Sequence, residues 1–325
     1  MLRKILKISI WFAVLTIVAL WFTITQPFVG SIDRVPNIDS NPARLRQHVV
    51  TLTEQLPAQY SGYELQMQKA AYIFERMSQY TRRVRYQRFE VDGVEYRNVL
   101  GSIGDDKSGC SVLVIGAHYD TFKDLPGADD NSSGVAGLLE IMRQMQDKKM
   151  RCAVEFVAYA NEEPPFFRTE NMGSYVHAES LQNRGLSLEL MISVEMIGYY
   201  SDEPNSQTYP IGLMKYLYSD KGDFITVVGD FHNISQVRET KKLMASQMSM
   251  PVYSINAPKS LVGVDFSDHL NYWNRDMPAV MVTDTAFYRN PWYHTNKDLA
   301  DKLDFTRMAD VVNGLTALAI SYQAE

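Results

Sequence analysis

The sequence predicts an α/β fold in which helices flank both faces of a mostly parallel mixed sheet. From residue 111 onward, short apolar runs alternate with longer segments of helical periodicity, as in residues 112–118 followed by 134–146. This alternation is typical of a sheet covered on both sides. In addition, His, Asp and Glu residues follow the apolar runs. Sheets of this kind bind their ligands outside the carboxyl ends of the strands.

The individual elements follow from periodicity and from end signals. Asn41 and Pro42 are suited to the cap and first position of a helix, and Asp92-Gly93 is a hairpin turn signal. The remaining boundaries come from hydrophobic alternation. We expect helices over residues 42–56, 63–80, 134–146, 173–185, 237–248 and 306–322, a hairpin over 84–103, and strands over 112–118, 154–160, 190–198, 224–230, 251–255 and 278–284.

Length and composition indicate one large domain with a full core. The chain has 325 residues, of which 46% are hydrophobic and 22% charged, and its net charge is -6. This length suits one large domain better than several. The acidic balance, without a Lys/Arg stripe, argues against a nucleic-acid partner.

The first 32 residues differ from the rest. Arg3, Lys4 and Lys7 precede a charge-free run over residues 8–32, and the apolar centre of this run is residues 8–24. This length is at the lower limit for a membrane span, and basic residues before a span keep the N-terminus cytoplasmic. We therefore expect a signal anchor over residues 1–32 and a single extracytoplasmic catalytic domain over residues 33–325. A cleaved signal peptide, which would give a secreted protein, is the alternative.

The chain has two cysteines, Cys110 and Cys152, and each precedes an apolar strand. If these strands are neighbours in the sheet, an oxidising compartment would allow a disulfide between them. Two small buried hydrophobic side chains are an equally good interpretation. The sequence leaves both open.

The segment 115–134 carries the first group of chemistry-bearing residues. His118 and Asp120 alternate around Tyr119, so an extended backbone directs both to the same side and the carboxylate can orient the imidazole. Asp129 and Asp130 stand just before a predicted helix. Capping would account for one of these two acids but not for both.

The second group follows later strands. Glu162 and Glu163 are adjacent after residues 154–160, and Glu195 lies within the apolar run 190–198. His294 follows the last predicted strand and a loop. Buried carboxylates are costly unless a cation is near, and a divalent metal is a suitable one. In an adjacent pair, one carboxylate can bind metal while the other acts as general base.

These residues resemble a known family. The motifs GAHYDT, GADDNSSG, NEEPP with MGS, SVEMIG and YHTNKDLADKLD stand in the order found in co-catalytic dizinc aminopeptidases, the bacterial leucyl-aminopeptidase-like group related to glutamate carboxypeptidase and glutaminyl cyclases. The match covers roughly residues 98–303. It implies the zinc-dependent exopeptidase fold, two zinc ions per chain, and peptide substrates cleaved at the N-terminus.

The resemblance also implies a role for each motif residue. Asp130 would bridge the two ions, with His118 and Glu195 on one side and Glu163 and His294 on the other. Glu162 would be the general base toward a water held between the ions, and Asp120 would hold His118. The family more often has Asp at the position of Glu195, which puts geometry and metal preference at issue.

Other interpretations of the function remain open. A glutaminyl cyclase-like enzyme with one zinc, or a membrane-anchored relative without catalysis, would keep the fold. A carboxypeptidase would need a basic pocket, for which Arg168, Arg275 and Arg289 are candidates. Asp268-His269 is expected to be structural or part of a substrate pocket. We expect three further histidines to be solvated: His48, His177 and His232.

Overall fold

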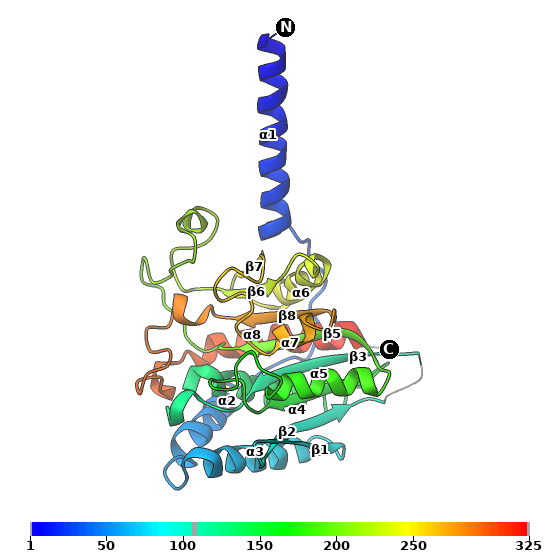
Figure 1. Cartoon of the computed structure of the whole chain (residues 1–325), viewed down its shortest axis with the longest axis vertical. Coiled ribbons are helices and arrows are strands. Elements are labelled where there is room, and N and C mark those ends of the chain that lie inside the picture. Colours follow the sequence, from blue (N-terminus) through cyan, green and yellow to red (C-terminus); the bar gives the residue numbers. More distant parts are fainter. Residues whose placement is uncertain (1, 106–108, 324–325) are drawn as a thin grey trace.

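The computed structural model describes residues 2–105 and 109–323. Within them, eight strands form one sheet in the order β1-β2-β4-β3-β5-β8-β6-β7. The strands are β1 (Val84–Val91), β2 (Val94–Ile103), β3 (Ser111–His118), β4 (Val154–Tyr159), β5 (Ser187–Glu195), β6 (Ile225–Gly229), β7 (Val252–Asn256) and β8 (Ala279–Thr283). Figure 1 shows how they stack below a long N-terminal helix.

The sheet is mixed, as expected. Four pairs are parallel: β3/β4, β3/β5, β5/β8 and β6/β7. The β1–β2 hairpin turns at Asp92-Gly93 and pairs antiparallel with β4, and β6 runs antiparallel to β8. The carboxyl ends of β3, β4, β5 and β8 therefore share one edge of the sheet.

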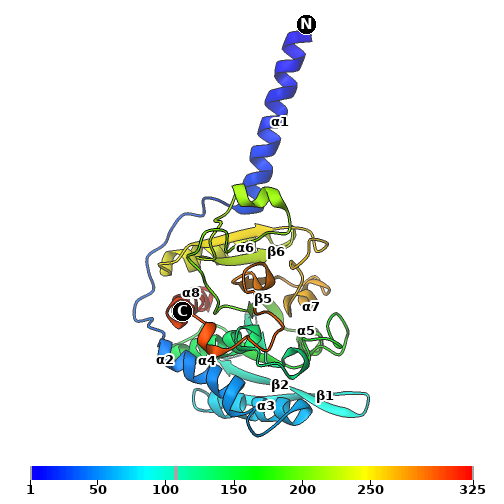
Figure 2. The ribbon, with the colours of Figure 1, turned by 90° about the vertical axis from the view of Figure 1, so that its left-hand side faces the viewer.

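Helices cover both faces of the sheet because the strand side chains are apolar on both sides. In β4, Phe156 and Ala158 belong to one apolar core, while Val157 and Tyr159 belong to a second core on the other face. The first core packs against α2 (Pro42–Val50), α3 (Gly62–Ser78), α4 (Gly134–Met145), α6 (Ile234–Gln247) and α8 (Phe305–Gln323). The second packs against α5 (Gly173–Asn183) and α7 (His269–Trp273) (Figure 2).

Helix boundaries agree with the expected ones within a few residues, with one change of winding. The helix expected over residues 42–56 is α-helical over Pro42–Val50 and continues as a π-helical turn over Thr51–Gln55. Asn41 caps its start by accepting from the backbone N–H groups of Ala43 and Arg44. The cap and the N1 proline thus fix this helix start as the sequence predicts.

Cys110 and Cys152 form a disulfide, with 5.6 Å between their Cα atoms. The bond joins the segments that enter β3 and β4, which are parallel neighbours. Of the two interpretations left open by the sequence, the structure therefore has the disulfide.

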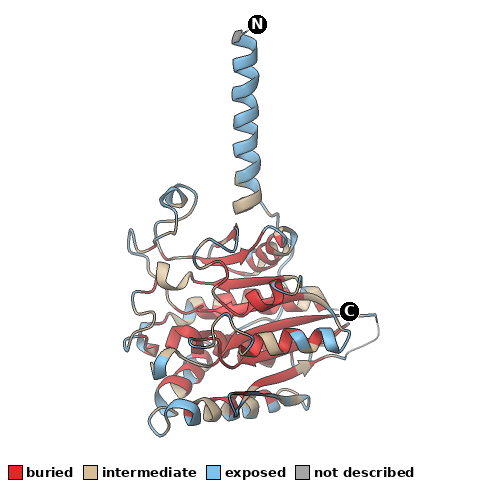
Figure 3. Ribbon diagram, in the orientation of Figure 1, coloured by how far each residue is buried: buried red, intermediate tan, exposed pale blue. Residues whose placement is uncertain are grey.

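The N-terminal helix α1 (Leu2–Thr25) projects from the domain, and its side chains are exposed over most of its length (Figure 3). Residues Arg3–Thr25 are long and apolar enough to cross a membrane, and none of that apolar window is buried against the domain. An apolar, unburied helix near the N-terminus has the length and composition of a membrane span, and signal sequences share these features.

Two of the three histidines expected to be solvated are buried. His177 lies against Tyr272 Oη at 2.6 Å and Glu155 Oε2 at 3.2 Å. His48 lies 2.6 Å from Tyr72 Oη, and burial lowers its pKa to about 4. The prediction was wrong for both because their partners stand 22 to 95 residues away. His232 is exposed, as expected.

Candidate metal centre

Strand ends bring the candidate residues together at one edge of the sheet. His118 is the last residue of β3, and Glu195 is the last residue of β5. Glu162 and Glu163 follow β4, while His294 follows β8 and a loop. Parallel pairing places these strand ends side by side.

Asp130 lies between the two histidines. Its Oδ1 is 3.2 Å from His118 Nε2, and its Oδ2 is 3.0 Å from His294 Nε2. Glu195 Oε2 is 3.4 Å from His118 Nε2, and Glu163 Oε1 is 3.2 Å from His294 Nε2. The two oxygens of one carboxylate thus face two separate His-carboxylate pairs.

Two groups of three ligand atoms follow from these distances. One comprises His118, Asp130 and Glu195, and the other comprises Asp130, Glu163 and His294. Within each group, the atoms lie within 4.8 Å of one another, and Asp130 is common to both. Imidazole nitrogens with carboxylate oxygens are the ligand set of catalytic zinc.

The charge balance of this cluster also fits metal ions. Four carboxylates are buried here, and within the described residues their ion-pair partners are His118 and His294. Burial and the charge of Asp130 raise the pKa of Glu163 to about 8. Burial and the neighbouring charges of Glu163 and Glu195 raise the pKa of Glu162 well above its usual value. Two histidines cannot balance four buried carboxylates, and bound cations would supply the remaining positive charge.

The same negative charges raise the pKa of both histidines and so favour their protonated, cationic form. Burial alone would lower the pKa of His118, but the carboxylates of Glu195 and Glu162 outweigh it and raise that pKa well above its ordinary value. The pKa of His294 is raised to about 9, because hydrogen bonds with Asp130 and Glu163 outweigh burial. Protonated histidines and bound cations are thus alternative sources of the same positive charge.

Asp120 has two contacts at once. Its Oδ1 lies 3.5 Å from His118 Nδ1, as the His-x-Asp spacing predicts. It also accepts hydrogen bonds from the backbone N–H groups of Glu162, at 3.1 Å, and Glu163, at 3.0 Å. One side chain therefore orients the imidazole and fixes the backbone of the two adjacent acids.

Asp129 and Asp130 do not act as helix caps. Asp129 accepts from the backbone N–H of Gly198 at 2.9 Å and from Asn290 Nδ2 at 2.8 Å. Asp130 points to the histidines, and the Ser133 side chain makes no capping bond at the start of α4. Two adjacent acids thus serve two sites, one structural and one facing the metal groups.

Sequence reasoning missed several supporting residues. Asp298 accepts from the backbone N–H groups of Asp129 and Asp130, at 3.0 and 3.1 Å, and so shapes the loop that presents Asp130. Ser267 Oγ donates to Glu195 Oε2 at 2.6 Å. Asp298 stands four residues after His294 within the motif YHTNKDLADKLD, which is the signal that could have identified it.

His294 is held by aromatic rings and by strained backbone. Its ring stacks on Phe122 at 4.1 Å and on Tyr293 at 3.8 Å between ring centroids. His294 has φ 55°, Asn161, just before Glu162, has φ 62°, and Met196, just after Glu195, has φ 47°. Non-glycine residues with positive φ are uncommon and cluster at functional sites.

The other sequence candidates lie elsewhere. Arg289 is buried and donates to Gln207 Oε1 and to the carbonyl of Phe224. Arg168 pairs with Asp265, and Arg275 pairs with Glu179. Asp268 and His269 are both buried, and His269 Nε2 lies 2.8 Å from the carbonyl of Val264.

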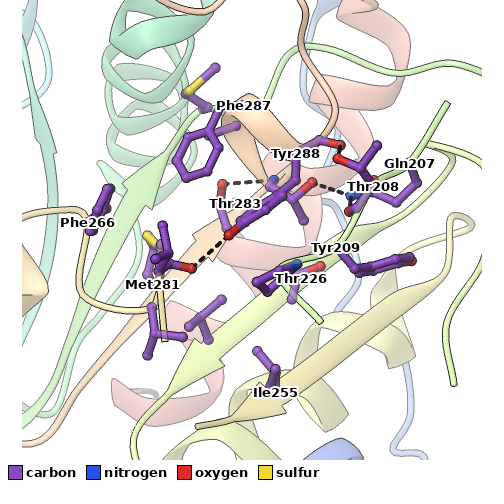
Figure 4. Close-up of a pocket in the computed structure, with 18 of the residues that line it drawn as sticks. Gln207, Thr208, Tyr209, Thr226, Ile255, Phe266, Met281, Thr283, Phe287 and Tyr288 are labelled. Atoms are coloured by element: carbon purple, nitrogen blue, oxygen red, sulfur yellow. Dashed lines mark hydrogen bonds between the residues drawn. The ribbon is translucent and has the colours of Figure 1, made fainter. Parts of the chain in front are cut away.

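An apolar pocket adjoins the cluster (Figure 4). Glu195 and Tyr293 form its boundary with the metal groups, and alternate residues of β6 and β8 form one wall: Thr226, Val228, Met281 and Thr283. Loop residues cover it, among them Tyr209, Met214, Val264, Phe266, Phe287 and Tyr288.

Fold and site together place a candidate metal centre at the carboxyl edge of an α/β sheet. Residues 98–319 match the family model for Peptidase family M28, which is more than half of the chain. The chain belongs to this peptidase family.

Individual relatives agree with this assignment. The protein YfbL of Escherichia coli (strain K12) is 43% identical over 302 residues, which are 90% of this chain and 92% of YfbL. A protein of Arthroderma otae named "Probable leucine aminopeptidase" is 26% identical over 66% of this chain. That match spans about half of the fungal protein, 53% of its length.

Solved structures show the same fold. The zinc aminopeptidase BSAP from Bacillus subtilis aligns with a TM-score of 0.71 at 14% identity, over 89% of this chain and 96% of BSAP. A glutaminyl cyclase from Bacteroides thetaiotaomicron aligns with a TM-score of 0.65 at 15% identity, over 88% of this chain and 98% of the cyclase. The expected family and the expected fold are thereby confirmed.

Proposed function

We propose that this protein is a membrane-anchored aminopeptidase that uses two zinc ions. The observation that carries the proposal is the position of Asp130, whose two carboxylate oxygens face two different His-carboxylate pairs. A single-metal site needs only one such group. His118 and Glu195 would hold one ion, Glu163 and His294 the other, and Asp130 both.

Bound zinc ions would polarise the scissile carbonyl and acidify water at neutral pH. Glu162 is the general base: it lies beside both metal groups, with an oxygen 3.9 Å from His118 Nε2, and is not a member of either. It takes the proton of the attacking water and returns it to the leaving amine.

Asp120 positions this base. Its carboxylate holds the backbone N–H groups of Glu162 and Glu163, so the base and a metal ligand keep a fixed separation. The same carboxylate orients His118. Asp120 therefore acts through these residues, as a positioning residue.

The pocket in Figure 4 is suited to the side chain of an apolar N-terminal residue, because it is predominantly apolar and adjoins Glu195. The three arginines that a carboxypeptidase might use are engaged elsewhere: Arg289 with Gln207, Arg168 with Asp265 and Arg275 with Glu179. Cleavage at the amino end of an apolar peptide is therefore the activity that these surroundings support.

We propose further that α1 remains attached as a membrane anchor. Lys241 Nζ donates to the carbonyls of Thr25 and Gln26, and Ser254 Oγ donates to that of Thr25. Helix C-termini leave their last carbonyls without partners, and these side chains supply them. The basic residues before the span favour a catalytic domain outside the cytoplasm.

The test combines metal analysis with turnover. The full chain, purified in detergent, is analysed for zinc and assayed on aminoacyl chromogenic amides before and after chelation. About two zincs per chain, with chelator-sensitive release of leucyl or phenylalanyl amides, is the expected result. One zinc, no hydrolysis and cyclisation of N-terminal Gln peptides would instead identify a glutaminyl cyclase. A chain that binds no zinc would be a non-catalytic member of the fold.

A further inference from the structure

The position of α1 is fixed by a cluster of buried polar contacts. Besides the bonds from Lys241 and Ser254, the Gln26 side chain donates to the carbonyl of Ile234 at 3.0 Å and to Asn256 Oδ1 at 2.6 Å. Thr25 and Gln26 are both buried. The end of α1 is therefore seated between the start of α6 and the end of β7, and the domain keeps one face toward α1.

That face carries a second apolar feature. The apolar tip, residues 211–217, contains the 3₁₀ turn Gly212–Tyr216. Four of its side chains are strongly exposed: Ile211 at 51%, Leu213 at 67%, Tyr216 at 74% and Leu217 at 44%. Single exposed apolar residues are normal on protein surfaces, but a cluster of this kind marks an interaction site.

The apolar tip lies at the level where α1 ends. Figures 1 and 2 differ by a 90° turn about the vertical axis. Both show this yellow-green segment at the same height along the long axis as the last turns of α1. Phe28, just beyond α1, and Phe231, three residues before Ile234, are also exposed, at 69% and 47%. The β1–β2 hairpin lies at the opposite end of the domain.

We propose that the apolar tip enters the surface of the same lipid bilayer that α1 spans. This inference rests on the proposed membrane anchor. If α1 crosses the bilayer, its Thr25 end marks the boundary of the hydrocarbon, and the tip stands at that depth. The composition fits this depth: Tyr216 is an interfacial residue type, and Lys215, whose Nζ lies 5.1 Å from the Tyr216 ring centre, can extend its amine to the headgroups.

The docked tip would bring lipid next to the substrate pocket. Met214, within the tip, is one of the residues that line the apolar pocket beside Glu195. Two attachment points, α1 and the tip, would prevent the domain from tilting freely about the anchor. The pocket would then take its substrates at the membrane surface.

Site-directed fluorescence in the full chain tests this placement. The two native cysteines form the disulfide, so Leu213→Cys introduces one free thiol for an environment-sensitive nitrobenzoxadiazole label. Glu90→Cys, at an exposed position of β1, is the matched control. Each labelled chain is reconstituted into phosphatidylethanolamine–phosphatidylglycerol vesicles with and without lipids that carry a nitroxide near the top of the acyl chain.

The expected result is a blue-shifted emission at position 213 that nitroxide lipids quench several-fold more strongly than the emission at position 90. Equal quenching at both positions would overturn the proposal. So would a blue shift that rises with protein-to-lipid ratio and is not quenched, because a second copy of the chain would then cover the tip. The melting temperature of each labelled chain is compared with that of the parent to exclude misfolding.

Alkaline carbonate extraction separates failure of the tip from failure of the anchor. A chain that stays in the vesicles while position 213 is not quenched would refute the docked tip and leave the anchor standing. A chain that carbonate releases would refute the anchor and, with it, the docked tip. Neither outcome depends on measuring aminopeptidase activity, so this test is independent of the proposed reaction.

Discussion

The β3–β4–β5 part of the sheet and the β8–β6–β7 part serve the site in different ways. The first presents buried charged side chains at its carboxyl edge, among them His118, Glu163 and Glu195. The second presents an apolar face, formed by alternate residues of β6 and β8, to the pocket. Strand ends thus position the reacting groups, and a strand face gives shape to the pocket.

Strand direction accounts for this difference. β3, β4 and β5 are parallel, so their carboxyl ends meet at one edge. β6 runs antiparallel to β8, and its carboxyl end therefore points to the other edge. Within the described residues, neither metal group includes a residue of β6 or β7. Reaction and specificity should therefore respond to separate mutations.

The largest effect is expected at the general base. Glu162→Gln removes the proton acceptor but leaves both metal groups intact, so turnover should fall by about 10²–10⁴-fold while zinc content is unchanged. Steady-state assays on leucyl amide with elemental analysis measure both quantities. Glu170→Gln, an exposed acid on the same loop, is the matched control. Full activity in the Glu162 variant would refute its role.

Next is the shared carboxylate. Asp130→Ala should remove both zinc ions, whereas His294→Ala should remove only one, because Asp130 belongs to both ligand groups and His294 to one. Zinc per chain after dialysis, together with turnover, distinguishes the two variants. If both variants kept the same zinc content, Asp130 would not be a bridging ligand.

A third change addresses the pocket alone. Val228→Phe replaces a small isopropyl group on the β6 wall with a phenyl ring that narrows the pocket. This change should lower kcat/KM for phenylalanyl amides by about 10–200-fold, the range for steric discrimination in apolar pockets. Alanyl amides, which need less room, should lose much less, and zinc content should not change. An equal loss for both substrates would show that the two parts of the sheet are not separable.

The smallest effect on turnover is expected at the disulfide, which lies at the start of β3 and β4, away from the carboxyl edge. Cys110→Ser with Cys152→Ser opens a link across 42 residues and should lower the free energy of unfolding by about 2–4 kcal/mol. Turnover of the folded variant should match that of the parent. Urea denaturation measures the change, and reduced parent protein is the control. A large loss of activity would show that the strand starts influence the site.

Much of the fold and of the candidate site was predictable because the signals are local. Alternation of apolar runs with helical periodicity identifies strands and helices, and Asn41-Pro42 and Asp92-Gly93 mark a cap and a turn. His118, Glu163, Glu195 and His294 stand at, within or after apolar strands, where buried charges need a cation, and the family resemblance pointed to Asp130. The structure brings these five together.

Other features depend on partners that are distant in the chain. Asp298 meets the backbone of Asp129 across 169 residues, and Lys241 meets Thr25 across 216. His177 was expected to be solvated, yet it is buried between Glu155 and Tyr272. A histidine in a helix shows no local sign of such partners.

The sequence by itself determined the class of fold, the family, the apolar N-terminal segment and the set of residues suited to bind metal. These depend on periodicity and on side-chain chemistry, which are properties of short stretches. Only the tertiary structure decided that the two cysteines are paired, that Asp130 faces two separate groups, and that an apolar pocket lies beside Glu195. These depend on which strands become neighbours and in which direction they run, and packing over the whole chain settles both.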